Sequence, residues 1–131
     1  NFKRVLKHRN LKSPKKVIFG SGKIIVDLLN DESFKKIDSG TEIVSLEQLY
    51  PFPLKEIKEI LNISSLKEII WLQEEPRNRG AWKYFNENII EIHENKLKLQ
   101  YVGRKPSATT ATGSSSVHKI QQKRIIDSIL K

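Results

Sequence analysis

Two short stretches contain the residues whose types and spacing could do chemistry. One places two carboxylates and two guanidinium groups within a single turn, in the order Glu74-Glu75-Pro76-Arg77-Asn78-Arg79-Gly80. The other reads Gly20-Ser21-Gly22-Lys23 and follows an apolar run. If a helix opens there, the backbone amides of Ser21 and Gly22 favour a bound anion, which Lys23 can reach. A solvated turn of mutually paired charges and a tight glycine turn are the competing explanations, and composition does not separate them.

Several other motifs are excluded by their spacing. The phosphate loop of nucleotide triphosphatases needs Ser or Thr after its lysine, where this chain has Ile24. Glu74 and Glu75 are adjacent, so on a strand they point to opposite faces and do not form an acid–base pair. The three histidines share no metal-ligand spacing, and the absence of cysteine removes thiolate ligands, Cys nucleophiles and disulfides. His118 remains of interest because it lies near the start of a predicted helix.

These residues must be positioned by a regular alternation of strands and helices. Runs of β-branched and aromatic residues predict strands at 17–19, 42–46, 68–73 and 97–102, and apolar residues at helical spacing predict helices at 23–29, 54–61, 80–92 and 117–130. Pro76 should end the third strand, and Asn78 is the expected cap of a helix that opens near Gly80. Repeated strand–helix units predict an α/β fold with a mainly parallel sheet of about 4–5 strands flanked by helices.

The net charge of +9 is concentrated at the start of the chain. Residues 1–16 contain seven of the 24 basic residues and no acidic residue, which leaves 17 basic against 15 acidic residues in the rest. We therefore expect a basic lead-in or linker over residues 1–15 and one α/β domain over residues 16–131. No apolar run approaches the ~20 residues of a membrane helix, so no membrane partner is expected.

A parallel sheet would bring the basic residues of the loops together. Lys23, Arg77, Arg79 and Arg104 all follow predicted strand ends. The carboxyl ends of parallel strands lie at one edge of a sheet, and ligands bind at that edge in open α/β folds. These side chains are therefore expected at a common rim.

The order of several short motifs resembles that of one family. The motifs are Ser21-Gly22-Lys23 with Asp27-Leu28-Leu29, Glu47-Gln48-Leu49-Tyr50-Pro51-Phe52-Pro53, Gln73-Glu74-Glu75-Pro76 with Asn78 and Gly80-Ala81-Trp82, Gly103-Arg104 with Ser107-Ala108 and Ala111-Thr112-Gly113, and Val117-His118-Lys119 with Gln121-Gln122. Over residues 16–131, this combination resembles the C-terminal domain of the thiamine-diphosphate-dependent E1 component of the 2-oxoglutarate dehydrogenase complex. The resemblance implies a transketolase-like C-terminal fold, a small and mainly parallel α/β sandwich.

For activity, the resemblance implies oxidative decarboxylation of 2-oxoglutarate and succinyl transfer to the lipoyl group of the E2 component. In that family thiamine diphosphate and Mg²⁺ are held chiefly by the two preceding domains, so the present region is expected to bind neither and to be inactive alone. It resembles a scaffold that completes the E1 homodimer and, in some members, offers a regulatory site for AMP or acetyl-coenzyme A. The implied location is the bacterial cytoplasm or the mitochondrial matrix.

The resemblance also implies roles for particular residues, none of them catalytic. The candidates for the effector or anion site are Ser21, Gly22, Lys23 and Arg104. The structural or interface motif comprises Glu74, Glu75, Asn78, Gly80, Trp82 and His118. Trp82 fits either the domain's own core or a subunit interface, and the core is the favoured interpretation.

Two alternative functions stay open. The Gly20-Ser21-Gly22-Lys23 turn would also suit a stand-alone nucleotide-binding α/β module. The basic residues 1–16 would suit a nucleic-acid-binding domain, but Phe2 is the only aromatic residue among them, and nucleic-acid binding is therefore the less favoured alternative.

Overall fold

The computed structural model describes residues 4–21, 23–31, 37, 39–47, 51–76, 81–93 and 97–104. After the first strand, the strands and helices alternate along the chain as the sequence predicts. In order they are β1 (Val5–Lys7), β2 (Lys16–Gly20), α1 (Lys23–Asn30), β3 (Thr41–Leu46), α3 (Leu54–Leu61), β4 (Glu68–Pro76), α4 (Trp82–His93) and β5 (Lys98–Arg104). The last predicted helix, at 117–130, lies outside the described residues.

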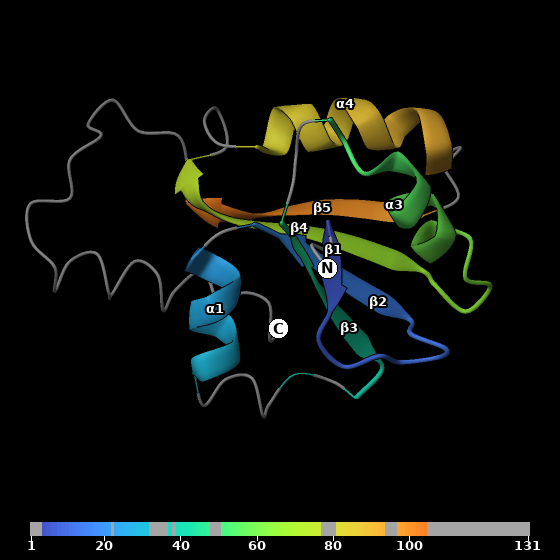
Figure 1. Cartoon of the computed structure of the whole chain (residues 1–131), viewed down its shortest axis with the longest axis horizontal. Helices are drawn as coiled ribbons and strands as arrows, with labels where there is room; N and C mark the ends of the chain where they lie inside the picture. The colour runs from blue at the N-terminus through green and yellow to red at the C-terminus, as the bar shows by residue number, and fades with distance from the viewer. Residues whose placement is uncertain are drawn as a thin grey trace, which may run out of the picture.

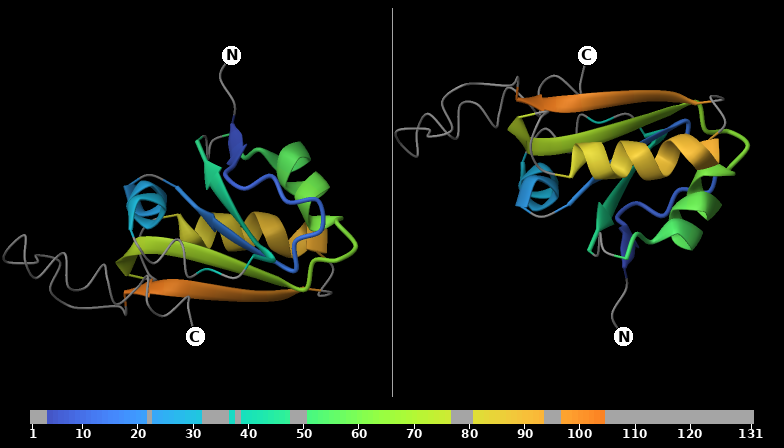
Figure 2. Two further views of the ribbon diagram at one scale, coloured as in Figure 1. Left: turned by 90° about the horizontal axis from the view of Figure 1, so that it is seen from below. Right: turned by 90° about the horizontal axis from the view of Figure 1, so that it is seen from above.

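One five-stranded sheet forms the centre of the molecule, with the strand order β1-β3-β2-β4-β5. β2 pairs in parallel with β3 and with β4, and β4 pairs in parallel with β5, whereas β1 runs antiparallel to β3. Helices cover both faces, with α1 on one and α3 and α4 on the other (Figures 1 and 2). The prediction of an α/β fold with a mainly parallel sheet of 4–5 strands is confirmed.

The face of the sheet covered by α3 and α4 is packed with aromatic rings. Phe85 of α4 lies against Trp71 of β4, with ring centroids 4.4 Å apart, and against Phe19 of β2 at 5.2 Å. Phe52, in the segment before α3, extends this cluster toward Phe85 at 6.1 Å. Alternate residues of a strand point to the same face, so the sheet contributes every second side chain to this core.

The face covered by α1 is aliphatic. Ile24, Ile25 and Leu28 of α1 pack onto Ile18 of β2 and Leu72 of β4, and all five side chains are buried. This contact requires a glycine at the end of β2, because a β-carbon on residue 20 would lie 2.7 Å from the Ile25 δ-methyl and 2.9 Å from the Leu72 carbonyl oxygen. Helix α1 can therefore approach the sheet only where the backbone carries no side chain.

Strand β1 was not among the predicted strands, because residues 1–15 were expected to be a lead-in. Leu6 pairs with Ser45 of β3, and the flanking backbone bond runs from the Glu47 amide to the Arg4 carbonyl at 2.8 Å. The Arg4 guanidinium donates two hydrogen bonds of 2.8 Å to the Glu56 carboxylate of α3. These partners lie about 40 to 50 residues away, a separation at which local pattern gives no signal.

A buried carboxylate organises the turn between β1 and β2. Glu42 of β3 is 1% exposed, and its oxygens accept hydrogen bonds from the backbone amides of Arg9 at 2.9 Å, Leu11 at 2.8 Å and Ile43 at 3.0 Å. The Arg9 guanidinium in turn donates to the Thr41 carbonyl at 2.9 Å. A buried polar side chain is tolerated only when it is well hydrogen-bonded. The turn that contains Arg9 and Leu11 and the strand β3 that contains Glu42 therefore stabilise each other.

Candidate functional site

The carboxyl ends of the parallel strands meet at one edge of the sheet, as the fold requires. Gly20 ends β2 and is followed by the half-buried Ser21, after which α1 opens at Lys23. On the other side of β4, Arg104 ends β5 and lies opposite Pro76. Gly20 pairs with Leu72 and Leu72 with Val102, so Gly20 and Val102 are two strand spacings apart, roughly 10 Å, and β5 ends two residues after Val102. The backbone thus brings Lys23 and Arg104 to the same edge.

At this edge, between β2 and β4, the chain changes the side of the sheet to which it adds new strands. From β2 the chain passes through α1 on one face to β3, and it later returns to the opposite side of β2 to form β4. The helices that follow β2 and β4, which are α1 and α4, therefore lie on opposite faces, and α/β proteins of this topology bind ligands where two neighbouring strands diverge in this way (Figures 1 and 2). The two chemically promising stretches of the sequence adjoin this point, because one follows β2 and the other ends β4.

The end of β4 agrees with the prediction that Pro76 ends this strand. The strand continues past the apolar run, through Glu74 and Glu75, and its last residue is Pro76. Its register with β5 shifts between Leu72 and Pro76, which is a β-bulge or irregularity. Pro is tolerated in a strand at such a place because the missing amide interrupts no regular ladder.

Several predicted site residues cannot be placed further. Gly22, Asn78, Gly80 and His118, together with Arg77 and Arg79, lie outside the described residues. For Lys23, Glu74, Glu75 and Arg104 the description covers the backbone and not the side chain. Anion binding by Ser21, Gly22, Lys23 and Arg104 therefore stays a prediction that rests on backbone placement.

Gln73 is the residue at this edge whose role the sequence did not reveal. It is 3% exposed, and its Oε1 accepts a hydrogen bond of 2.8 Å from the Trp71 indole and one of 3.1 Å from the backbone amide of Trp82. The first amides of a helix lack partners within the helix, so Gln73 satisfies one of them at the start of α4. A polar residue within a buried run, followed nine residues later by a predicted helix start, is the signal that could have suggested this contact.

Trp82 is buried in the core of the domain. Its side chain is 8% exposed and belongs to the cluster of the aromatic face, with its ring centroid 5.4 Å from that of Tyr101 in β5. Together with Gln73, it fixes the position at which α4 begins. The packing agrees with the favoured core interpretation, and an interface role for Trp82 is untested.

The described residues show neither a cluster of metal ligands nor a membrane-spanning helix. They contain no group of three or more His, Cys, Asp or Glu side chains arranged to hold a metal ion. Within the same residues, no helix combines the length and apolar character needed to cross a membrane.

The fold and this edge define a doubly wound α/β domain whose candidate ligand site lies at the switch point between β2 and β4. The family described as 2-oxoglutarate dehydrogenase C-terminal matches this chain over residues 1–130. The chain therefore belongs to that family, as the motif order indicated.

Curated relatives with the same assignment come from several bacteria. The 2-oxoglutarate dehydrogenase E1 component of Bacillus subtilis (strain 168) is 40% identical over 119 residues, or 88% of this chain. The E1 components of Staphylococcus aureus (strain JH9) and Exiguobacterium sp. (strain ATCC BAA-1283 / AT1b) are 39% identical over 117 residues and 35% identical over 121 residues, which cover 88% and 89% of this chain. In each case the chain spans 12% of the relative's length.

Proposed function

We propose that this chain is the C-terminal scaffold and regulatory domain of a 2-oxoglutarate dehydrogenase E1 component. The observation that carries the proposal is the family match over residues 1–130, together with relatives that bear this name and are about eight times longer. The full enzyme would decarboxylate 2-oxoglutarate oxidatively and transfer succinyl to the lipoyl group of an E2 succinyltransferase. It would work as a homodimer in the bacterial cytoplasm or the mitochondrial matrix.

In this proposal the thiamine diphosphate and Mg²⁺ of the enzyme are bound by other domains. Bound thiamine diphosphate supplies the carbanion chemistry of decarboxylation. The described residues of this chain contain no cluster of carboxylates or histidines that would suit the metal. The contribution of this region would be to hold the fold at the subunit contact and to respond to an effector.

The test of the proposal is an activity comparison. The chain alone, supplied with thiamine diphosphate and Mg²⁺, should fold and release no CO₂ from 2-oxoglutarate. The full-length polypeptide that carries it should turn over, and truncation of this region should abolish turnover. Turnover by the chain alone, or undiminished turnover by the truncated polypeptide, would contradict the proposal.

A regulatory anion site is the second part of the proposal, and the switch point between β2 and β4 supports it. Ser21 and Gly22 would offer backbone amides to a phosphate of AMP or acetyl-coenzyme A, and Lys23 and Arg104 would supply charge. Calorimetric titration of both compounds should give binding that Lys23→Ala weakens, while Lys83→Ala, an exposed lysine of α4, should leave it unchanged. Binding that Lys23→Ala does not affect would remove this site.

The activity comparison separates the first of the two less favoured functions. A stand-alone nucleotide-binding module would bind AMP as here, but the longer polypeptide would show no 2-oxoglutarate turnover. A nucleic-acid-binding domain would depend on the basic residues near the start of the chain. Against that alternative, Arg4 is bound to Glu56 and the Arg9 guanidinium to backbone carbonyls, so two of these cations are already engaged.

A further inference from the structure

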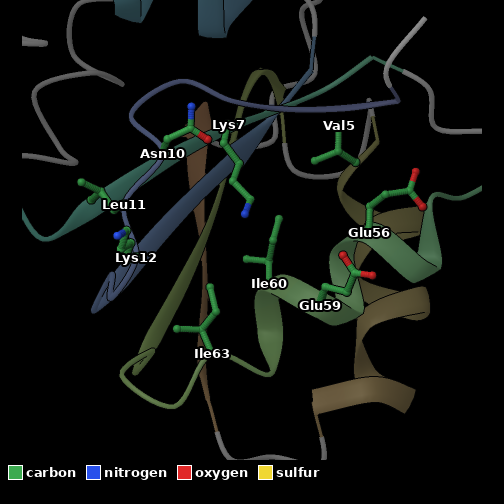
Figure 3. Close-up of a pocket in the computed structure, with 9 residues that line it drawn as sticks. All are labelled: Val5, Lys7, Asn10, Leu11, Lys12, Glu56, Glu59, Ile60 and Ile63. Atoms are coloured by element: carbon green, nitrogen blue, oxygen red, sulfur yellow. The ribbon is translucent and has the colours of Figure 1, made fainter. Parts of the chain in front are cut away.

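A groove of about 500 Å³ lies between β1, the loop that follows it and α3 (Figure 3). Four aliphatic side chains belong to its lining, and together they are called its apolar base: Val5, Leu11, Ile60 and Ile63. Ile60 belongs to the core of the aromatic face, and Val5 and Ile63 pack against that core while staying partly exposed. The groove therefore exposes apolar surface that is continuous with the core, a surface on which another apolar side chain could be buried. We call it the β1–α3 groove.

The two walls of the β1–α3 groove carry opposite charges. Lys7 of β1 and Lys12 of the loop stand on one side, and Figure 3 shows the Lys7 side chain extending toward Ile60. Glu56 and Glu59 of α3 stand on the other side. Glu56 is neutralised by Arg4, whereas Lys7 and Lys12 take part in no ion pair within the described part of the chain. Among the described residues, the groove thus offers two cations and one carboxylate, Glu59, that take part in no ion pair, beside an apolar base.

Further exposed lysines continue from this basic wall along the amino edge of the sheet. Lys15 follows Lys12 by three residues, and its carbonyl accepts a hydrogen bond of 2.8 Å from the Lys67 amide. The Lys67 carbonyl accepts one of 3.1 Å from the Lys98 amide. The backbones of Lys15, Lys67 and Lys98 therefore lie side by side in neighbouring segments, about 4.8 Å from one to the next. All three side chains are exposed. Positive charge extends from the groove across the edge of the sheet opposite the candidate anion site.

We propose that the β1–α3 groove binds an acidic segment of a partner protein, with an aliphatic side chain of that segment on the base and its carboxylates against Lys7 and Lys12. Charge complementarity identifies the partner as acidic, and the apolar base supplies the buried anchor that stable interfaces use. Nucleic acid fits less well, because the groove lining contains no aromatic ring for base stacking and Glu59 would repel phosphates. The proposal does not depend on the anion site or on the assigned activity.

The test uses the whole chain and a short fluorescein-labelled peptide in which pairs of Glu alternate with pairs of Leu. Fluorescence anisotropy should show saturable binding that weakens as salt is added. Lys12→Glu and Lys7→Glu should each weaken binding several-fold, and the two together by about tenfold or more. Glu59→Lys should strengthen it. Lys83→Glu makes the same charge change on α4, outside the groove, and should leave the affinity unchanged.

Each comparison has an outcome that would overturn the proposal. Absence of saturable peptide binding would do so, as would equal loss of affinity in Lys83→Glu and Lys12→Glu. A peptide with Gln in place of every Glu should bind more weakly, and equal binding would remove the role of charge. A single-stranded oligonucleotide of the same net charge could bind as tightly and lose affinity in the same lysine variants. That result would overturn the proposal and identify nucleic acid, not an acidic protein, as the partner. Lys12 lies on an exposed loop, so its variant stays informative if Lys7→Glu disturbs β1.

Discussion

The face of the sheet covered by α3 and α4 is built from aromatic rings, whereas the face covered by α1 is aliphatic. Large rings fill volume but pack only in certain orientations, and this face adds two polar anchors, the Gln73 contact with Trp71 and Trp82 and the Arg4–Glu56 ion pair. The aliphatic face relies instead on the close approach of α1, which Gly20 permits. One sheet thus holds its helices in two ways. Oriented aromatic rings and polar contacts hold α3 and α4, and the short distance between α1 and the sheet holds α1.

The largest expected effect is at the centre of the aromatic face. Phe85 is fully buried and touches three other rings, so Phe85→Ala should leave a large cavity and cost about 3 to 5 kcal/mol of unfolding free energy. Urea unfolding followed by tryptophan fluorescence measures the loss. The matched change on the other face, Leu28→Ala, should cost less because a smaller side chain is removed. Equal losses would contradict this expectation, because the larger ring would then contribute no more stability than the smaller aliphatic side chain.

The polar anchor at the start of α4 comes next. Gln73→Leu keeps the size of the side chain but leaves the Trp71 indole and the Trp82 amide without their acceptor, at a cost of about 2 to 3 kcal/mol. Hydrogen exchange should speed up in the first turn of α4 before it does elsewhere. Gln100→Leu, the same change at an exposed position of β5, should stay within about 0.5 kcal/mol of the parent. If Gln73→Leu were as stable as Gln100→Leu, the hydrogen bonds of Gln73 would not stabilise the start of α4.

The close approach on the aliphatic face predicts a smaller effect. Gly20→Ala would bring a β-carbon against the Ile25 δ-methyl and the Leu72 carbonyl, and the adjustment should cost about 1 to 2 kcal/mol. Ile25→Val removes that methyl group, so the double variant should recover at least about 0.5 kcal/mol relative to the sum of the single changes. Strict additivity would instead place the strain at the Leu72 carbonyl.

The sequence predicted the parallel part of the fold because its signals are local. Periodic apolar residues located β2, β3, β4 and β5 and the three helices α1, α3 and α4, and the repeated strand–helix units implied their shared edge. Family resemblance then agreed with the fold reached from periodicity. The placement of Lys23 and Arg104 at one edge follows from that topology alone.

What the sequence did not predict depends on contacts between distant residues. β1 is three residues long in a basic segment, and only its pairing with β3 and the Arg4–Glu56 bridge make it a strand. The β1–α3 groove depends on that strand, so it could not be anticipated either. Gln73 looked like one polar residue at the end of a strand, and its role emerged only from its distance to Trp82.

The smallest expected effect belongs to the outer anchor of the aromatic face, the Arg4–Glu56 ion pair. The hydrogen bonds from Arg4 hold the pKa of Glu56 below its ordinary value of 4.5. A lowered pKa in the folded state means that the pair stabilises the protein above pH 4.5 and that this contribution is lost as the pH falls through the lower, folded-state pKa. Both side chains are about one-third exposed, so solvent screening limits the contribution to a few tenths of a kcal/mol, at most about 1.

Glu56→Gln tests this anchor. Near neutral pH the variant should be slightly less stable than the parent, and the two should converge in acid, when urea unfolding is measured across the range from pH 7 to pH 3. High salt should shrink the difference at neutral pH. Glu59→Gln removes the same charge from the same helix without breaking the bond to Arg4, so it should lack this pH-dependent loss. If Glu59→Gln behaved identically, the general field of α3, and not the pair, would be responsible, and α3 would be held on the sheet by its buried side chains alone.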